Sequence, residues 1–151
     1  MSQYLSFELV NKANPDIKVD LGYWCTSIAR GIYSDFEGIF QYTGENDEVL
    51  DIETLKSYID TLHSGIEEYK DSLRKVQEEK RENTEYLLKA QTQVVVNAIK
   101  ESIDMNEDSI AYWEEEIDTW SSVESRLEYI LIILQENCNE WKKDNEQYYN
   151  S

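Results

Sequence analysis

Cysteine is scarce in this sequence: Cys25 and Cys138 are the only two, and they lie too far apart for a metal-binding Cys-x-x-Cys pair. The disulfide framework of a small secreted protein is therefore excluded. No stretch reaches the roughly 18 apolar residues of a membrane span, and the N-terminus lacks the basic start and apolar run of a secretion signal. These absences predict a cytoplasmic protein, or one assembled into a larger particle from the cytoplasm.

Catalytic motifs are also missing. The one histidine, His63, has no second histidine or Glu-x-x-His repeat with which to form a metal site. Cys25 has no histidine in a recognisable partner motif that would activate it as a nucleophile. A glycine-rich phosphate loop, an EF-hand, HExxH and GxSxG are all absent. We therefore expect no enzyme activity, cofactor, metal or small-molecule substrate; a carboxylate metal enzyme is a third hypothesis, which would require tight metal binding.

Basic residues are few: 14 lysines and arginines stand against 32 acidic residues, a net charge of −18. Such a charge repels nucleic-acid phosphates and anionic lipid surfaces, so we expect no direct nucleic-acid or membrane binding. With 40% hydrophobic and 12% aromatic residues, the acidic groups are expected to cover a folded body rather than to form a disordered tail.

The first 44 residues show two periodicities and form the first predicted module. Residues 5–9 alternate apolar and polar, residues 11–16 contain the only proline, and alternation resumes at Ile17, which predicts a β-hairpin. Helical spacing from about Thr26 onward then predicts a short amphipathic helix. Its apolar residues are Cys25, Ile28, Ala29, Ile32, Phe36, Ile39 and Phe40. Residues 43–47 are expected to be a loop.

Residues 45–151 form the second predicted module, a long helical hairpin. A heptad pattern begins after Asp51, a favourable N-cap, and lapses over residues 77–85; apolar residues return at Leu87, which predicts one long helix to about residue 103. Its apolar positions are Leu55, Ile59, Leu62, Ile66, Tyr69, Leu73 and Val76. After a predicted turn at residues 104–108, a second pattern comprises Ile110, Trp113, Ile117, Trp120, Leu127, Leu131, Leu134, Cys138, Trp141 and Tyr148. The predicted fold is mainly α, an antiparallel, coiled-coil-like hairpin with a small N-terminal β-hairpin and short helix.

This hairpin contains one inconsistency, because it places the polar residues 77–85 opposite the apolar residues 126–134. A turn near Arg81 to Thr84 would remove the mismatch and give a three-helix bundle as the alternative fold.

Three groups of residues are candidate surfaces. An acidic partner surface next to the predicted turn consists of Asp104, Glu107, Asp108, Glu114, Glu115, Glu116 and Asp118. An apolar block that points all round a helix is a candidate oligomer or packing surface, with Ile130, Leu131, Ile133 and Leu134. The hairpin also gathers aromatic residues at its junction with the first module, namely Trp24, Tyr58, Trp141 and Tyr148.

These features favour a non-enzymatic structural, assembly or adaptor protein that acts through helical oligomerisation and protein–protein contacts. Similar architectures occur among phage accessory, adaptor and assembly proteins, an analogy at the level of the fold that suggests a phage-encoded protein. The second hypothesis is an acidic inhibitor that imitates a phosphate backbone and occupies the basic groove of a nucleic-acid-binding protein. The expected partner is a protein, with self-association first.

Overall fold

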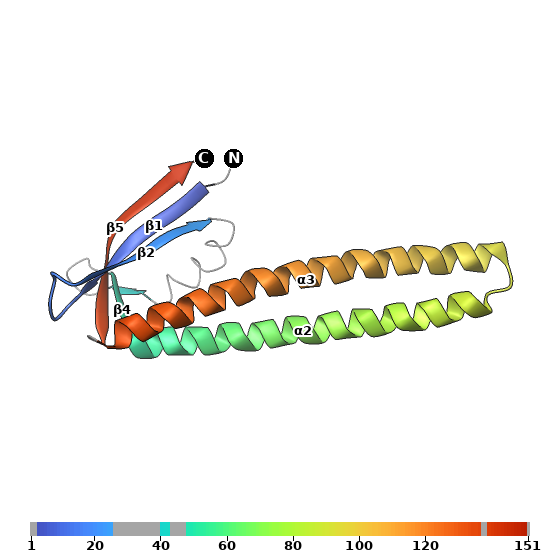
Figure 1. The fold of residues 1–151 in the computed structure, drawn as a ribbon, viewed down its shortest axis with the longest axis horizontal. Coiled ribbons are helices and arrows are strands. Elements are labelled where there is room, and N and C mark those ends of the chain that lie inside the picture. The colour runs from blue at the N-terminus through green and yellow to red at the C-terminus, as the bar shows by residue number, and fades with distance from the viewer. Residues whose placement is uncertain (1–2, 26–39, 43–47, 137–138, 151) are drawn as a thin grey trace. The chain divides into compact units, whose positions relative to one another are not determined.

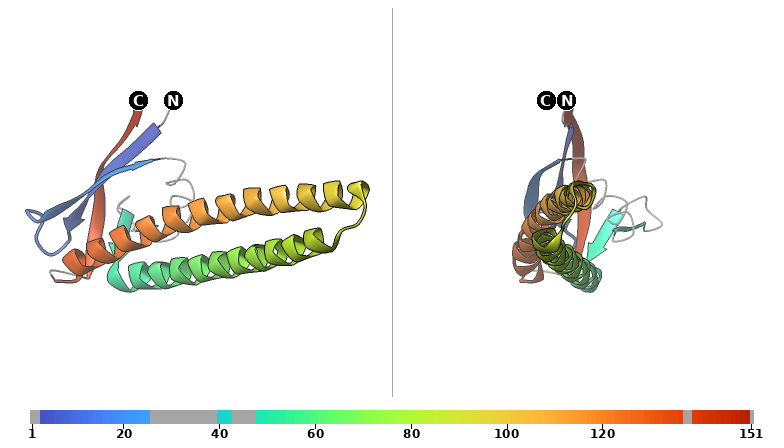
Figure 2. Two further views of the ribbon diagram at one scale, coloured as in Figure 1. Left: turned by 45° about the vertical axis from the view of Figure 1, so that its right-hand side comes forward. Right: turned by 90° about the vertical axis from the view of Figure 1, so that its right-hand side faces the viewer.

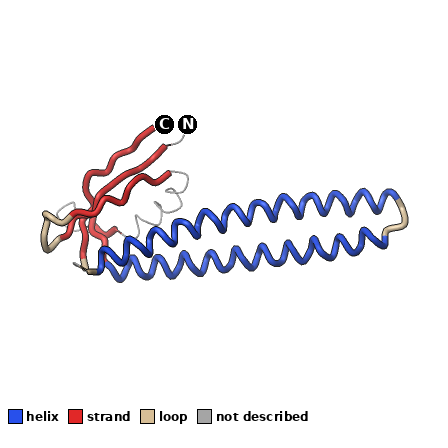
Figure 3. Tube along the Cα trace, in the orientation of Figure 1, coloured by secondary structure: helices blue, strands red, loops and turns tan. Residues whose placement is uncertain are grey.

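The computed structural model describes residues 3–25, 40–42, 48–136 and 139–150 (Figure 1). Two long helices and a five-stranded sheet account for most of these residues (Figure 3). The chain divides into two compact units: a sheet unit, Met1–Asp60 with Arg126–Ser151, and a hairpin unit, Thr61–Ser125. Among the described residues, no helix combines the length and the apolar character that a membrane crossing requires.

The sheet is antiparallel at every described pairing, with the strand order β2-β1-β5-β4-β3. Its strands are β1 (Gln3–Asn11), β2 (Lys18–Cys25), β3 (Phe40–Tyr42), β4 (Glu48–Asp51) and β5 (Glu140–Asn150). The predicted β-hairpin is confirmed as β1 and β2. Residues 26–39 and 43–47, on which the predicted short helix and loop fall, lie outside the described residues; Cys25 itself ends β2 and Phe40 begins β3.

Strand β5 corrects the prediction for the end of the chain. The heptad pattern extended a helix through Trp141 to Tyr148, but helix α3 ends at Gln135 and both residues belong to β5. β5 lies between β1 and β4 and pairs with both, so sheet pairing overrides a weak helical pattern there. Trp141 is fully buried, opposite Leu50 of β4 and Asn11 of β1. The sheet unit therefore combines residues from both predicted modules.

The core of the sheet unit draws on strands and helix ends alike. Buried apolar side chains come from β1, β4, the first turns of α2, the last turns of α3 and β5: Phe7, Leu9, Val10, Val49, Leu50, Ile52, Leu55, Ile59, Leu127, Ile130, Leu134 and Trp141. The two helices are inserted between neighbouring strands β4 and β5. The Ile52 amide donates a hydrogen bond to the Asn139 carbonyl at 3.0 Å, which joins the two ends of the insertion.

Helix α2 (Ile52–Lys89) begins where the sequence predicts. The Asp51 carboxylate accepts hydrogen bonds from the backbone amides of Glu53 at 2.8 Å and Thr54 at 3.3 Å, so Asp51 is the N-cap. Helix α3 (Gln93–Gln135) runs back antiparallel beside α2, as the views of Figure 2 agree. The long antiparallel helical hairpin is therefore confirmed.

The predicted turn at residues 104–108 is wrong, and so is the alternative at Arg81 to Thr84, because both segments are helical. The chain reverses at residues 90–92, where the Thr92 carbonyl accepts a hydrogen bond from the Val96 amide at 3.0 Å. This turn puts the polar residues 77–85 opposite the polar residues near 106. Asn83 Nδ2 donates to Asn106 Oδ1 at 2.8 Å, and Asn106 is buried. Polar residues of α2 therefore face polar residues of α3, and residues 77–85 no longer lie opposite the apolar residues 126–134 as in the predicted hairpin.

Candidate functional site

The closed end of the hairpin unit, residues 86–100, has an unusual surface. Leu88 and Val94 are 84% and 80% exposed, and Tyr86 and Val95 are exposed as well. Sequence reasoning missed this surface because it placed the turn at residues 104–108. The available signal was the run of three valines after Thr92 in a segment without acidic residues.

The apolar surface continues along α3. Val94, Met105 and Tyr112 are separated by eleven and seven residues, close to three and two whole turns, so they share one face of the helix. All three are exposed, and this face is therefore distinct from the one that packs on α2. It extends over about 27 Å at 1.5 Å per residue. We call Val94, Met105 and Tyr112 the outer stripe.

The face of α3 that packs on α2 includes the predicted Trp113, but Val123, which the predicted heptads do not include, is buried as well. Tyr69 and Trp113 lie with their ring centroids 5.3 Å apart, and Ile66 and Val123 are buried. Glu124 lies 3.0 Å from His63 Nδ1, and His63 is exposed. These residues hold the two helices together, whereas the outer stripe has no such role within the hairpin.

Charge is distributed unevenly along the hairpin unit. Residues 86–100 contain Lys89 and Lys100 and no acidic residue, whereas residues 101–118 contain eight acidic residues and no basic one. Neither lysine has an ion-pair partner within the described part of the chain. The closed end is thus locally basic on a chain whose net charge is −18.

The predicted acidic surface lies along the body of α3 rather than at the turn. Glu107 pairs with Lys80 of α2 at 3.4 Å, and Glu116 accepts a hydrogen bond from Trp120 Nε1 at 3.1 Å. The side-chain carboxylates of the other five have no ion pair or hydrogen bond among the described residues: Asp104, Asp108, Glu114, Glu115 and Asp118. All five are exposed, so α3 carries a row of carboxylates in contact with solvent.

The predicted oligomer or packing surface is divided between core and solvent. Ile130 and Leu134 are buried in the sheet unit, while Leu131 and Ile133 are half-buried. Their neighbours Tyr129 and Ile132 are the exposed apolar residues of this segment. The sheet unit itself therefore covers much of an apolar block for which the sequence suggested a second copy of the chain.

The predicted junction aromatics all fall within the sheet unit. Trp141 is in its core and Tyr58 is half-buried on α2. Trp24 of β2 and Tyr148 of β5 both stand opposite Leu5 of β1, so their backbones lie on one line across the sheet. The burial of Trp141 in the core favours a structural role for this residue.

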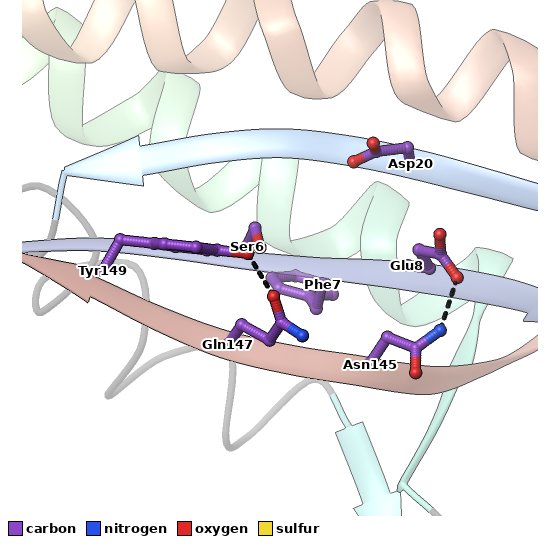
Figure 4. Close-up of a pocket in the computed structure, with 7 residues that line it drawn as sticks. All are labelled: Ser6, Phe7, Glu8, Asp20, Asn145, Gln147 and Tyr149. Atoms are coloured by element: carbon purple, nitrogen blue, oxygen red, sulfur yellow. Dashed lines mark hydrogen bonds between the residues drawn. The ribbon is translucent and has the colours of Figure 1, made fainter.

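A hollow of about 260 Å³ lies on the sheet where β1 meets both of its neighbours (Figure 4). The register shifts between Ser6 and Glu8 on both sides, because β2 and β5 each carry one extra residue there. Gly22 and Asn145 adopt positive φ values of 71° and 53° at these two bulges. The hollow is lined by Ser6, Phe7, Glu8, Asp20, Asn145, Gln147 and Tyr149.

Acidic groups and carboxamides dominate the chemistry of this hollow. Glu8 stands opposite Asp20 on one side and Asp144 on the other, and Asn145 Nδ2 donates to Glu8 Oε2 at 2.8 Å. Arg126 of α3 lies near Gly22; burial lowers its pKa, and the charge of Asp20 opposes that effect. The hollow therefore suits a hydrogen-bond donor. Among the described residues, no group of three or more His, Cys, Asp or Glu is arranged to hold a metal ion.

A lysine of β5 lies near Phe7, one of the residues that line the hollow. Lys143 of β5 pairs with Glu48 and Glu146, and its Nζ is 5.9 Å from the centre of the Phe7 ring. Burial alone would lower the pKa of Lys143, but hydrogen bonds to Glu146 and Glu48 outweigh it and raise that pKa. The lysine therefore stays charged and serves to neutralise the two carboxylates.

In comparisons with family models, with curated proteins and with solved structures, nothing matches this chain.

Proposed function

We propose that the protein is a non-enzymatic assembly or adaptor protein that acts through protein–protein contacts made by its helical hairpin unit. One observation carries this proposal. Among the described residues, the hairpin unit buries only two apolar side chains, Ile66 and Val123, yet it exposes six large ones. These are Tyr86, Leu88, Val94, Val95, Met105 and Tyr112.

An exposed apolar surface of this kind is unfavourable for a protein that works alone, because each buried apolar side chain contributes roughly 1.5–3 kcal/mol relative to its exposed state. Contact with a partner would recover that free energy. The scarcity of cysteine supports placing this activity in the cytoplasm, or in a particle assembled from it.

Site-specific photo-crosslinking in the native cell tests the proposal. A photoreactive phenylalanine analogue replaces Tyr86 or Tyr112 in the hairpin unit, and Tyr149, an exposed tyrosine of β5, serves as the matched control. We expect discrete crosslinked proteins from positions 86 and 112 and little product from position 149. Equal yields at the three positions would contradict a contact surface on the hairpin unit.

A second candidate function rests on the exposed carboxylates of α3. Asp104, Asp108, Glu115 and Asp118 lie on one side of the helix, away from α2, and have no basic partner among the described residues. Such a row could occupy the nucleic-acid groove of a basic protein.

This second function predicts binding to a basic nucleic-acid-binding protein that weakens steeply with salt and after charge reversal at Glu114 to Glu116. Competition between the chain and a fluorescent DNA duplex for such a protein measures it. Displacement that is insensitive to salt would exclude phosphate mimicry.

A further inference from the structure

We infer that two copies of this chain pair through the outer stripe of α3, with their α3 helices antiparallel. This inference rests on the proposed function and names the partner of the hairpin surface. The stripe suits a helix, because Val94, Met105 and Tyr112 lie on one narrow line along about five turns of α3. The exposed Glu101 lies on the same line between Val94 and Met105. A second copy offers the same line, and a two-fold axis brings the two lines together.

Charge decides the direction of the pairing. Each α3 passes from a segment with basic and no acidic residues, up to Lys100, into the segment 101–118 with eight acidic and no basic residues. A parallel pair would set these acidic segments side by side, where like charges repel. In an antiparallel pair the acidic segment of each copy faces the basic closed end of the other.

The N-terminal end of α3 supports the same arrangement. Its first turn contains no acidic residue, so the partial positive charge of the helix end is not compensated from within the helix. Setting Val94 of one copy across from Tyr112 of the other puts Glu114 and Glu115 beside that helix end. These two carboxylates have no ion pair within the described residues of their own chain.

Analytical ultracentrifugation of two matched variants tests the pairing. Met105 and Tyr129 are 65% and 66% exposed and both lie on α3, but only Met105 belongs to the outer stripe. Met105→Glu places two like charges near the two-fold axis, and we expect the dimer dissociation constant to rise at least about tenfold. Tyr129→Glu adds the same charge elsewhere and should change that constant less than about twofold.

Circular dichroism establishes that both variants remain helical, and glutamate is a good helix former at either position. A wild-type chain that stays monomeric at millimolar concentration and low salt would overturn the pairing. An equal loss of dimer in both variants would overturn it too. Crosslinks from Tyr112 to other proteins, together with a monomeric chain, would reject the second copy as partner and leave the proposed function intact.

Distances between spin labels show whether the two α3 helices pair parallel or antiparallel. In a chain with Cys25 and Cys138 changed to serine, labels replace the exposed residues Ser102 or Ser122 of α3. A pair centred near residue 103 puts the two 102 positions about 10 Å apart and the two 122 positions about 57 Å apart. A short distance at both positions would show a parallel pair and overturn the antiparallel arrangement.

Discussion

At the scale of single residues, Gly22 and Asn145 allow β2 and β5 to bulge at the same level of β1. Both have positive φ, which glycine adopts freely and asparagine tolerates better than most residues. The Asp20 carboxylate accepts a hydrogen bond from the Gly22 amide at 2.7 Å, and the Asp144 carboxylate accepts one from the Asn145 amide at 2.9 Å. An acidic residue just before each bulge thus provides a hydrogen-bond acceptor for a backbone amide that does not pair with the neighbouring strand.

Replacing Gly22 with alanine should therefore destabilise the sheet unit. An alanine in the left-handed conformation costs about 1–2 kcal/mol. Its Cβ would also lie 2.9 Å from the Arg126 guanidinium, which can move away because it ends a flexible side chain. Chemical denaturation followed by circular dichroism measures the loss.

Gly65 provides the matched control. It lies inside α2, and a Cβ there would meet nothing within 4 Å. We expect Gly65→Ala to stabilise the chain by roughly 0.5–1 kcal/mol, since glycine is a poor helix former. Equal effects of the two substitutions would contradict a required positive φ at position 22.

At the scale of elements, the sequence predicts the helices whose apolar residues repeat periodically. It misses the features that depend on contacts between residues distant in sequence. The heptads from Leu55 to Val76 are periodic, and they identify the packed face of α2. The turn at residues 90–92 contains neither glycine nor proline, and its one mark is Thr92, whose hydroxyl oxygen accepts a hydrogen bond from the Val95 amide at 3.4 Å. The register depends on the buried contact between Asn83 and Asn106.

Strand β5 and the hollow were beyond prediction for a similar reason. Residues 140–150 are polar and show no clear alternation, and their strand conformation follows from pairing with β1 and β4, which are distant in sequence. The bulges that form the hollow arise from the same pairing. Gly22 was visible as a glycine inside a strand pattern, a known mark of a bulge.

The start of α2 makes the stability of the chain depend on pH. Hydrogen bonding to the Thr54 side chain lowers the pKa of Asp51 below its ordinary 3.8; burial opposes this, and the Thr54 and Glu53 amides add to it. A carboxyl group with a lower pKa in the folded chain stabilises it above the unfolded pKa. That stabilisation is lost as the pH falls through the folded pKa.

Asp51→Asn keeps a capping oxygen but removes the titrating group. We therefore expect the variant to lose less stability than the parent chain between about pH 5 and pH 2. Melting temperatures measured across this range by circular dichroism provide the comparison. Parallel curves for the two chains would show that Asp51 does not contribute to the acid sensitivity.

At the scale of the whole molecule, stability is shared unequally between the two units. The sheet unit contains most of the buried apolar side chains, and the hairpin unit contains two. The hairpin unit keeps its register through polar contacts such as Asn106 with Glu79 and Asn83, which contribute about 1 kcal/mol each. The two units are therefore expected to differ in their resistance to unfolding.

Trp141→Ala tests this difference. Trp141 is fully buried in the central strand, and its truncation should cost roughly 3–5 kcal/mol. Trp113 of the hairpin unit is half-buried, so Trp113→Ala should cost distinctly less. Chemical denaturation of the two variants gives both values. A loss at Trp113 as large as that at Trp141 would contradict a core concentrated in the sheet unit.

The joined ends of the helical insertion have a consequence for how chains of this architecture can change in length. Asp51 pairs with Glu140, and the Ile52 amide donates a hydrogen bond to the Asn139 carbonyl, so the two ends of the helical insertion lie side by side. The insertion therefore connects β4 to β5 as the loop of a β-hairpin would. Adding or deleting one heptad in each helix preserves both the faces on which α2 and α3 pack and the joined ends of the insertion. We expect the helices of homologues to differ in length by one heptad in each helix at a time. A four-residue turn should be able to replace the whole helical insertion without disturbing β4 and β5.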